Sequence, residues 1–167
     1  HNRLLEVVLA YRSSKSLLVA VHYDLFTWLE RGFHTAETLS HKLKLDRRAV
    51  GLLLDANTAL GFLKKQGSRY ANTPLSKDLL VATSPNYRGS NLKYQEQTWD
   101  AWSDLKAVVK TGRPQLSLLE WIHKDAFTKD YIKAMGDVAQ APARDLAGQL
   151  GLGRVSRTLD VGCGPGV

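Results

Sequence analysis

The stretch TAETLSHKLKLDRRAVGLLLDANTALGFLKKQGSRYANTP, residues 35–74, decides the fold. Thr35 is a candidate N-cap for a short helix over residues 36–43, because its side-chain oxygen can accept a hydrogen bond from a free backbone N–H. The residue three positions later is a threonine rather than a glutamate, so we expect no capping box. Asp46 is the candidate N-cap of a second helix that runs to about residue 60, since a carboxylate suits the free N–H groups there.

A short β-hairpin follows these two helices. Gly61 suits the position just after a helix, and residues 62–72 have strand-forming composition on both sides of a Gln-Gly-Ser turn. Residues 73–74, Thr-Pro, then open another short helix, as an N-cap followed by proline at the first helical position. Ahead of the whole stretch, apolar residues over 4–29 predict an opening helical region that Gly32 ends. This order of elements is typical of a winged helix-turn-helix domain.

A winged helix-turn-helix domain often reads the DNA major groove with its second helix, so a DNA-binding transcriptional regulator is the alternative function. A reader helix needs Arg, Lys, Asn or Gln on its outer face, and Arg47 and Arg48 stand at the start of this one. Leu52, Leu53 and Leu54 follow, however, and successive residues of a helix point about 100° apart. A helix that is apolar on several sides is buried on several sides, which fits dimerisation better. We therefore expect no specific nucleic-acid binding.

Helical patterns continue after the hairpin. A long helix is expected over about 87–110, with an aromatic stripe through Trp99 and Trp102. We place this stripe in the core or in a dimer interface rather than around a ligand. Asp125 is a candidate N-cap for a further helix, which Pro142 should kink or break because proline has no N–H to donate.

The sequence changes character at its end. Residues 157–161, Arg-Thr-Leu-Asp-Val, have the composition of a strand, and Gly-Cys-Gly-Pro-Gly follows at 162–166. Glycines are needed where the backbone turns sharply and approaches a ligand closely. A dinucleotide-binding fold spaces its glycines as G-x-G-x-x-G. Here the spacing is G-x-G-x-G, and Asp160 stands two residues ahead of the first glycine. The segment therefore predicts a strand followed by a ligand-binding turn.

This last segment resembles motif I of the Rossmann-like methyltransferases that depend on S-adenosyl-L-methionine. The order of the preceding elements is similar to the front half of the small-molecule O-methyltransferases of the plant and bacterial type, and the resemblance covers essentially the whole chain. The matching stretches are HYDLF at 22–26, TPLS at 73–76, Trp102 and Leu105 with KTGRP at 110–114, and Phe127 with Ala134 and Met135.

The resemblance implies S-adenosyl-L-methionine as cofactor. The residues that match its binding loop are Asp160, Gly162, Gly164 and Gly166, although many family members have glycine where Cys163 stands. In that family the front domain forms an intertwined homodimer and helps to roof the substrate pocket. The rear domain binds the cofactor and carries the catalytic base, usually a histidine. We therefore expect a homodimer.

The reaction implied by the resemblance is methyl transfer to a hydroxyl of a small, aromatic acceptor. The candidate substrate-pocket residues are Phe127, Tyr131 and Met135, which lie one helical turn apart; ordinary core packing is the alternative interpretation of these three. A catalytic residue is expected beyond Val167, so the catalytic residues stay unknown here.

The resemblance also divides the chain. It implies a winged-helix-like dimerisation domain over 1–84, a helical linker and substrate-roof region over 85–150, and the start of a Rossmann-like cofactor domain over 151–167. The expected fold class is thus mainly α with a small β-hairpin, followed by the first strand of a truncated α/β domain. Parallel strands need neighbours and covering helices, so we expect residues 158–161 to lack a pairing partner. For the same reason we expect the chain alone to be inactive and to bind the cofactor weakly.

The composition is that of a globular protein without a membrane span. Hydrophobic residues make up 44% of the 167, and the net charge of +7 is spread over a surface with no run of four basic residues. No apolar run approaches the ~18–20 residues that span a bilayer, and no signal peptide is recognisable. The single cysteine cannot form an internal disulfide, so a cytoplasmic protein is expected. The histidines have no metal-ligand spacing, so no metal site is expected.

Overall fold

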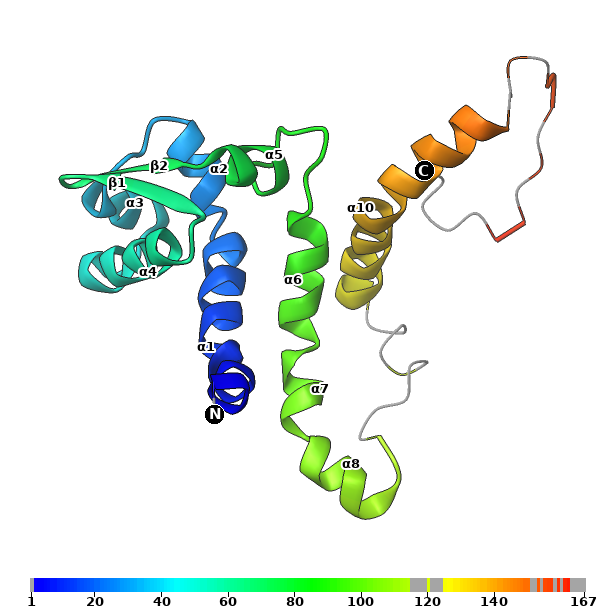
Figure 1. Ribbon diagram of the computed structural model, residues 1–167, viewed down its shortest axis with the longest axis horizontal. Coiled ribbons are helices and arrows are strands. Elements are labelled where there is room, and N and C mark those ends of the chain that lie inside the picture. Colours follow the sequence, from blue (N-terminus) through cyan, green and yellow to red (C-terminus); the bar gives the residue numbers. More distant parts are fainter. Residues whose placement is uncertain are drawn as a thin grey trace. The chain divides into compact units, whose positions relative to one another are not determined.

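The computed structural model is mainly helical, and its chain forms two compact units, His1–Gly89 (unit 1) and Ser90–Val167 (unit 2). It describes residues 2–114, 120, 125–150, 153, 155–157, 159 and 161–162, with the backbone alone at 125–127 and 141. Figure 1 shows the elements of unit 1. They are α1 (Asn2–His22), α2 (Leu25–Glu30), α3 (Ala36–Leu43), α4 (Arg47–Ala59), β1 (Leu63–Gln66), β2 (Arg69–Asn72) and α5 (Pro74–Leu79).

Among the described residues, no helix combines the length and the apolar character that a bilayer crossing requires.

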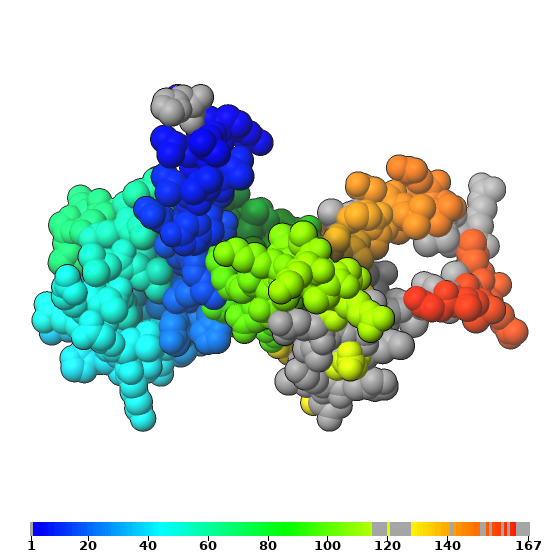
Figure 2. Space-filling model, turned by 90° about the horizontal axis from the view of Figure 1, so that it is seen from below, coloured from blue at the N-terminus to red at the C-terminus, as the bar shows by residue number. Residues whose placement is uncertain are grey.

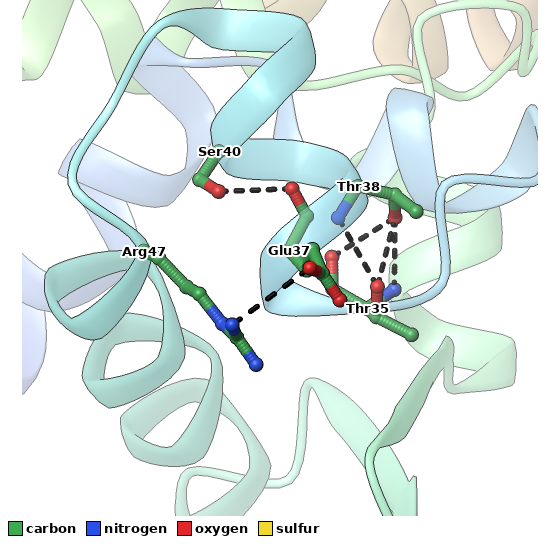
Figure 3. A network of polar contacts seen from close by, with 5 residues as sticks. All are labelled: Thr35, Glu37, Thr38, Ser40 and Arg47. Carbon is green, nitrogen blue, oxygen red and sulfur yellow. Dashed lines mark hydrogen bonds and ion pairs between the residues drawn. The ribbon is translucent and has the colours of Figure 1, made fainter.

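Reciprocal hydrogen bonds between Thr35 and Thr38 fix the start of α3. The Thr38 backbone N–H donates to Thr35 Oγ1 at 3.1 Å, and the Thr35 backbone N–H donates to Thr38 Oγ1 at 3.2 Å. Figure 3 shows this capping box. Our expectation that the box would be missing is wrong, because a threonine hydroxyl takes the accepting role that a glutamate usually fills.

The caps of α4 agree with the sequence. Asp46 Oδ1 accepts a hydrogen bond from the Ala49 backbone N–H at 2.7 Å. Gly61 stands two residues beyond the end of the helix with a φ of 81°, a left-handed conformation that glycine adopts without steric cost. Lys44 also has a positive φ, 56°, and closes α3. The predicted bounds of both helices are confirmed.

The opening helical region is interrupted at Asp24. α1 ends at His22 and α2 begins at Leu25, and Asp24 between them has a φ of 52°. Aspartate is one of the few residues other than glycine that adopt this left-handed conformation. The sequence pattern therefore placed the apolar residues correctly but did not reveal the break.

The hairpin is attached to the start of α3. β1 and β2 pair antiparallel, with Leu63 opposite Asn72 and Gln66 opposite Arg69. An isolated bridge then joins Arg69 to Thr35. Thr73 caps α5 by accepting a hydrogen bond from the Ser76 backbone N–H at 3.4 Å, as the Thr-Pro signal predicts.

The core of unit 1 lies where α1, α2, α3 and α4 meet the hairpin. α4 turns Leu54 into this core, fully buried, whereas Leu52 on another side of the same helix is 57% exposed. Asn57 is also fully buried, and its Nδ2 donates to the backbone oxygens of Leu53 at 2.9 Å and Ser16 at 3.4 Å. This side chain thereby joins α4 to α1.

Unit 2 contains a broken helical stretch in place of the single helix expected over 87–110, and that expectation is wrong. The helix is interrupted at Thr98 and again at Asp104. Thr98 Oγ1 donates to Gln95 O at 3.0 Å, which is the kind of local side-chain bond that competes with helical backbone bonding. The described elements are α6 (Gly89–Gln97), α7 (Trp99–Ser103), α8 (Leu105–Thr111) and α10 (Asp125–Gln149).

α10 runs through Pro142 without ending. The break that we considered there is therefore absent, although the ribbon of α10 changes direction along its length in Figure 1. A proline inside a helix removes one backbone hydrogen bond and commonly bends the helix instead of ending it.

Candidate functional site

The glycine turn near the C-terminus is the predicted cofactor loop. Gly162 is the one cofactor-loop candidate that the structure describes, and its φ is 83°. No heavy atom lies within 4 Å of the position that a Cβ would take, so backbone conformation, not crowding, demands glycine there. Asp160, Gly164 and Gly166, together with Cys163, lie outside the described residues.

The residues before this turn make no strand in the part of the chain that the structure describes. Leu159 and Val161 are 86% and 88% exposed. That residues 158–161 lack a pairing partner stays a prediction, based on the need of parallel strands for neighbours and covering helices.

The three candidate substrate-pocket residues share α10. Tyr131 and Met135 are half-buried and lie one turn apart. Phe127 belongs to the same helix, but its side chain lies outside the described residues. The sequence therefore placed this set on one helix correctly, while its contact with an acceptor stays a prediction.

Three contacts, two polar and one aromatic, join α6 to α10. The Asn91 backbone N–H donates to Asp137 Oδ2 at 3.0 Å. Tyr94 and Tyr131 then meet edge to face, with ring centroids 5.6 Å apart. The third contact is a hydrogen bond that Gln97 Nε2 donates to Asp130 Oδ2.

We predicted no role for these α6 residues from the sequence, because in that region we singled out only the tryptophans. Asn91, Tyr94 and Gln97 recur every three residues, and this spacing was the available signal for one polar helix face. Because Tyr94 packs on Tyr131, α6 belongs to the environment of the candidate acceptor residues.

The first half of α1 exposes an apolar surface. Figure 2 shows these turns, in dark blue, standing clear of the cyan side chains of α3 and α4. Single exposed apolar residues are ordinary, but a contiguous group of this size marks an interaction surface. The exposed residues are Leu4, Leu5, Val7, Val8, Leu9 and Tyr11.

The tryptophan stripe of unit 2 is only partly covered. Trp99 is half-buried, whereas Trp102 is 71% exposed, and Leu105 and Val109 after it are exposed as well. Within the described part of unit 2, this stripe is therefore surface at Trp102 and beyond, not core. A dimer interface, the second of our two predictions for this stripe, would explain why a side chain as large as that of Trp102 is exposed.

A DNA-reading helix would carry basic side chains at its start. At the start of α4, one such side chain, that of Arg47, pairs with the carboxylate of Glu37. Arg47 Nη1 lies 3.7 Å from Glu37 Oε1, and Figure 3 shows the two side chains facing each other. Farther along α4, Asp55 Oδ1 accepts hydrogen bonds from Lys65 Nζ at 2.6 Å and from Tyr70 Oη at 2.7 Å. The helix and the hairpin are thus fixed to each other by groups that a base-reading surface would leave free.

Two carboxylates in unit 1 are stabilised in their charged form. Hydrogen bonds from Lys65 and then Tyr70 lower the pKa of Asp55. Hydrogen bonds from Lys77 and then Asn72 lower the pKa of Glu30 in the same way. Burial raises the pKa of Tyr70. All three shifts keep these groups in their ordinary states at neutral pH, as expected of structural contacts and not of an acid–base pair.

No group of three or more metal-ligating side chains lies together among residues 2–114, 125–150 and the other described positions. The histidines of unit 1 contribute to other contacts. His34 O accepts from the Tyr70 backbone N–H at 2.7 Å, and the ring of His22 meets Tyr23 edge to face.

Comparison with protein families identifies the N-terminal part of the chain. Residues 5–82 match the family model described as the O-methyltransferase dimerisation domain. The matched range lies entirely within unit 1 and contains α1 from Leu5 onward, the two capped helices, the hairpin and α5.

Two curated relatives come from Streptomyces species. An N,N-dimethyltransferase of Streptomyces rimosus is 32% identical over 110 residues, which make up 65% of this chain and 32% of the relative. A 3-hydroxy-5-methyl-1-naphthoate 3-O-methyltransferase of Streptomyces sahachiroi is 27% identical over 158 residues, which make up 92% of this chain and 46% of the relative. The chain therefore spans less than half the length of either relative.

Solved structures share the fold. An O-methyltransferase family protein from Burkholderia thailandensis superposes with a TM-score of 0.74 at 26% identity, over 90% of this chain and 45% of its own. Human N-acetylserotonin methyltransferase, solved in complex with S-adenosylmethionine, superposes with a TM-score of 0.77 at 24% identity, over 90% of this chain and 49% of its own.

Proposed function

Residues 5–82 belong to the O-methyltransferase dimerisation-domain family, and from this premise we propose that the protein containing this chain transfers a methyl group from S-adenosyl-L-methionine to a small aromatic acceptor. The observation that carries the proposal is the match of residues 5–82 to the family's dimerisation domain. The relative from Streptomyces sahachiroi, by its name, methylates a hydroxyl of a naphthoate. A hydroxyl on an aromatic ring is accordingly the methyl acceptor that we propose.

The cofactor would be held at the glycine turn. Gly162, with its left-handed backbone, would let the chain pass close to the amino-acid end of S-adenosylmethionine. Asp160, Gly164 and Gly166 are proposed for the same loop on the sequence motif alone. Inside this chain, the proposed role of these residues is to hold and orient the cofactor, and we assign no catalytic base among them.

The acceptor would lie against α10. Phe127, Tyr131 and Met135 offer aromatic and polarisable surface to a flat ring, which suits dispersion contacts and aromatic packing. Positioning of the acceptor oxygen in line with the methyl group is the main contribution that such a surface can make to the rate.

We propose that the chain makes a homodimer through the exposed apolar residues of α1 in unit 1 and the stripe at Trp102 in unit 2. A surface of this size is costly to leave in water, and a symmetric pair buries it twice. This proposal divides the chain into three domains. They are a winged-helix-like dimerisation domain over 1–84, a helical linker and substrate-roof region over 85–150, and the start of a cofactor domain over 151–167. A cytoplasmic location stays a prediction from composition.

The alternative of a DNA-binding regulator has less support. Arg47 is paired with Glu37, and Leu52 exposes an apolar side chain on the would-be reader helix. An electrophoretic mobility shift at physiological salt should give no specific complex; an affinity near the ~10⁻⁸ M typical of specific sites would favour the regulator instead.

The direct test uses the protein that contains this chain. Purified protein is incubated with radiolabelled S-adenosylmethionine and 3-hydroxy-1-naphthoate, and labelled product is separated and identified. Transfer to the ring hydroxyl is expected. Titration calorimetry with S-adenosylmethionine alone gives the second readout, and absence of both binding and transfer would contradict the proposal.

A further inference from the structure

We propose that Asp137 is a positioning residue for the methyl transfer: its carboxylate caps α6 from α10 and thereby sets where α10 holds the acceptor. This inference rests on the proposed function, in which the acceptor lies against α10. It assigns a role to a side chain that lies outside both the sequence motifs and the family match over residues 5–82.

The burial of Asp137 is exceptional for its charge. Among the described residues, it is the one charged residue that is buried, with an exposure of 7%. Ala134, one turn earlier on α10, is fully buried, so this face of the helix is covered. Removing a carboxylate from water is costly unless another group stabilises its charge. Asp137 therefore needs a partner that favours a negative charge.

The start of α6 is that partner. Asp137 Oδ2 accepts a hydrogen bond from the Asn91 backbone N–H at 3.0 Å. Since α6 begins at Gly89, this N–H belongs to the first turn, whose amides have no partner inside the helix and carry partial positive charge. The first turn contains no acidic residue, and the side chain of Arg88 before it has only donors. Asp137 thus supplies the negative charge from 46 positions away in the chain.

A second polar contact fixes the other end of the same pair of helices. Gln97, at the end of α6, donates to Asp130 on α10. The partner numbers fall along α10 as they rise along α6, so the two helices run antiparallel, and Figure 1 shows them side by side. At 1.5 Å per residue, the two contacts lie roughly 9–10 Å apart along the helices. Two contacts at this separation oppose both sliding and rotation of α10 on α6.

The proposed acceptor residues Tyr131 and Met135 lie between Asp130 and Asp137 on α10. Successive residues of a helix point about 100° apart, so a small rotation of α10 would redirect both side chains. An acceptor that is misplaced by about 1 Å can react on the order of 100-fold more slowly. Asp137 can therefore control the rate of transfer without touching the acceptor.

Steady-state methyl transfer from S-adenosylmethionine to 3-hydroxy-1-naphthoate, on the protein that contains this chain, tests this role. Values of kcat and KM are obtained for each of the two substrates. Asp137→Ala removes the accepting carboxylate, whereas Asp137→Asn keeps an oxygen that can accept the same N–H. Asp145→Ala, at an exposed carboxylate of the same helix, is the control.

A second pair of variants removes the donor. Asn91→Pro eliminates the backbone N–H, and proline is tolerated in the first turn of a helix. Asn91→Ala removes the side chain and leaves the N–H, so it is the matched control. Hydrogen exchange of the amides in the first turn of α6 reports the hydrogen bond in the absence of any substrate. Thermal melting shows the fraction of each variant that is folded.

Asp137→Ala should lower kcat/KM for 3-hydroxy-1-naphthoate about 10–100-fold, the effect of a misplaced acceptor, and leave the KM for S-adenosylmethionine unchanged. Asp137→Asn should recover most of this loss, and Asp145→Ala should behave as the wild type. Asn91→Pro should reproduce the loss, whereas Asn91→Ala should not. Because both changes remove one hydrogen bond, combining Asp137→Ala with Asn91→Pro should add nothing further. The first-turn amides should exchange faster in Asp137→Ala and in Asn91→Pro.

Unchanged naphthoate kinetics in folded Asp137→Ala, beside normal transfer by the wild type, would overturn the role of Asp137 and leave the proposed function intact. An equal loss for both substrates, or losses that add in the double variant, would also contradict positioning. If Asp137→Ala does not fold, Asn91→Pro against Asn91→Ala gives the same comparison. Absence of transfer by the wild type defeats the proposed function and, with it, the inference.

Discussion

The hydroxyl of Tyr70 in β2 donates a hydrogen bond to Asp55 Oδ1 in α4 at 2.7 Å. The same oxygen receives Lys65 Nζ from β1 at 2.6 Å. One carboxylate oxygen therefore joins the second helix of the motif to both strands of the hairpin. Because the donors stabilise the charged form, they lower the pKa of Asp55 below its ordinary value of 3.8.

Replacement of Asp55 by Asn should destabilise the chain at neutral pH, because the amide cannot attract Lys65 as the carboxylate does. A group with a lowered folded-state pKa contributes stability above its unfolded value and loses it as the pH falls through the folded value. The difference between wild type and Asp55→Asn should thus be fully present at neutral pH and be lost progressively as the pH falls below 3.8, the ordinary pKa of this carboxyl. Urea denaturation across this range measures it. Asp145→Asn, an exposed carboxylate on α10, is the control, and an equal loss there would contradict this role for Asp55.

Leu54→Ala should cost about 2–5 kcal/mol of unfolding free energy, since the side chain is fully buried in the core of unit 1. Leu52→Ala, two positions earlier and 57% exposed, should change it by no more than about 0.5 kcal/mol. Chemical denaturation of both variants gives the comparison. Similar losses in the two would mean that α4 is covered on both sides, for example by a partner subunit.

Thr35→Ala should lower the stability by about 1 kcal/mol, because α3 loses the N-cap that binds the Thr38 N–H. Thr38→Ala should cost less, since it removes only the return bond to the Thr35 N–H. Thr83→Ala, at an exposed position outside the helices, serves as control. Denaturation midpoints rank the three, and a neutral Thr35→Ala would show that α3 is held by packing alone.

Gly162→Val should abolish binding of S-adenosylmethionine to the protein that contains this chain. Its φ of 83° is strained for any residue with a Cβ and most of all for a branched one. Gly153→Ala, at a glycine whose φ lies outside the left-handed region, should leave binding unchanged. Titration calorimetry measures both affinities. Normal affinity in Gly162→Val would refute the assignment of the turn to the cofactor.

Leu5→Glu combined with Val8→Glu should convert the proposed homodimer to monomer. Both side chains are exposed on α1, and burying two carboxylates in an apolar interface is strongly unfavourable. An obligate interface of this kind should bury more than ~2,000 Å². Light scattering at micromolar concentration reports the mass, with Leu75→Glu on α5 as the exposed-leucine control. A wild type that is already monomeric would end the proposal.

The features that the sequence revealed are those set by neighbouring residues. Asp46 caps α4, Gly61 ends it, and Thr73 with Pro74 opens α5, each as predicted. Every one of these depends on a hydrogen bond or a φ angle within a few positions, so residue identity and spacing are sufficient information. The threonine capping box was missed only because glutamate was expected in the accepting role.

The tertiary structure decided what depends on residues far apart in the chain. Asp55 and Tyr70 are 15 positions apart, Gln97 and Asp130 are 33 apart, and Asn91 and Asp137 are 46 apart. A periodic pattern shows that a helix has a polar face, but it does not show which distant group will meet that face, because many pairings satisfy the same local preferences. Sequence therefore determined the capped helices and the hairpin, whereas packing of α6 on α10 determined that Gln97 meets Asp130.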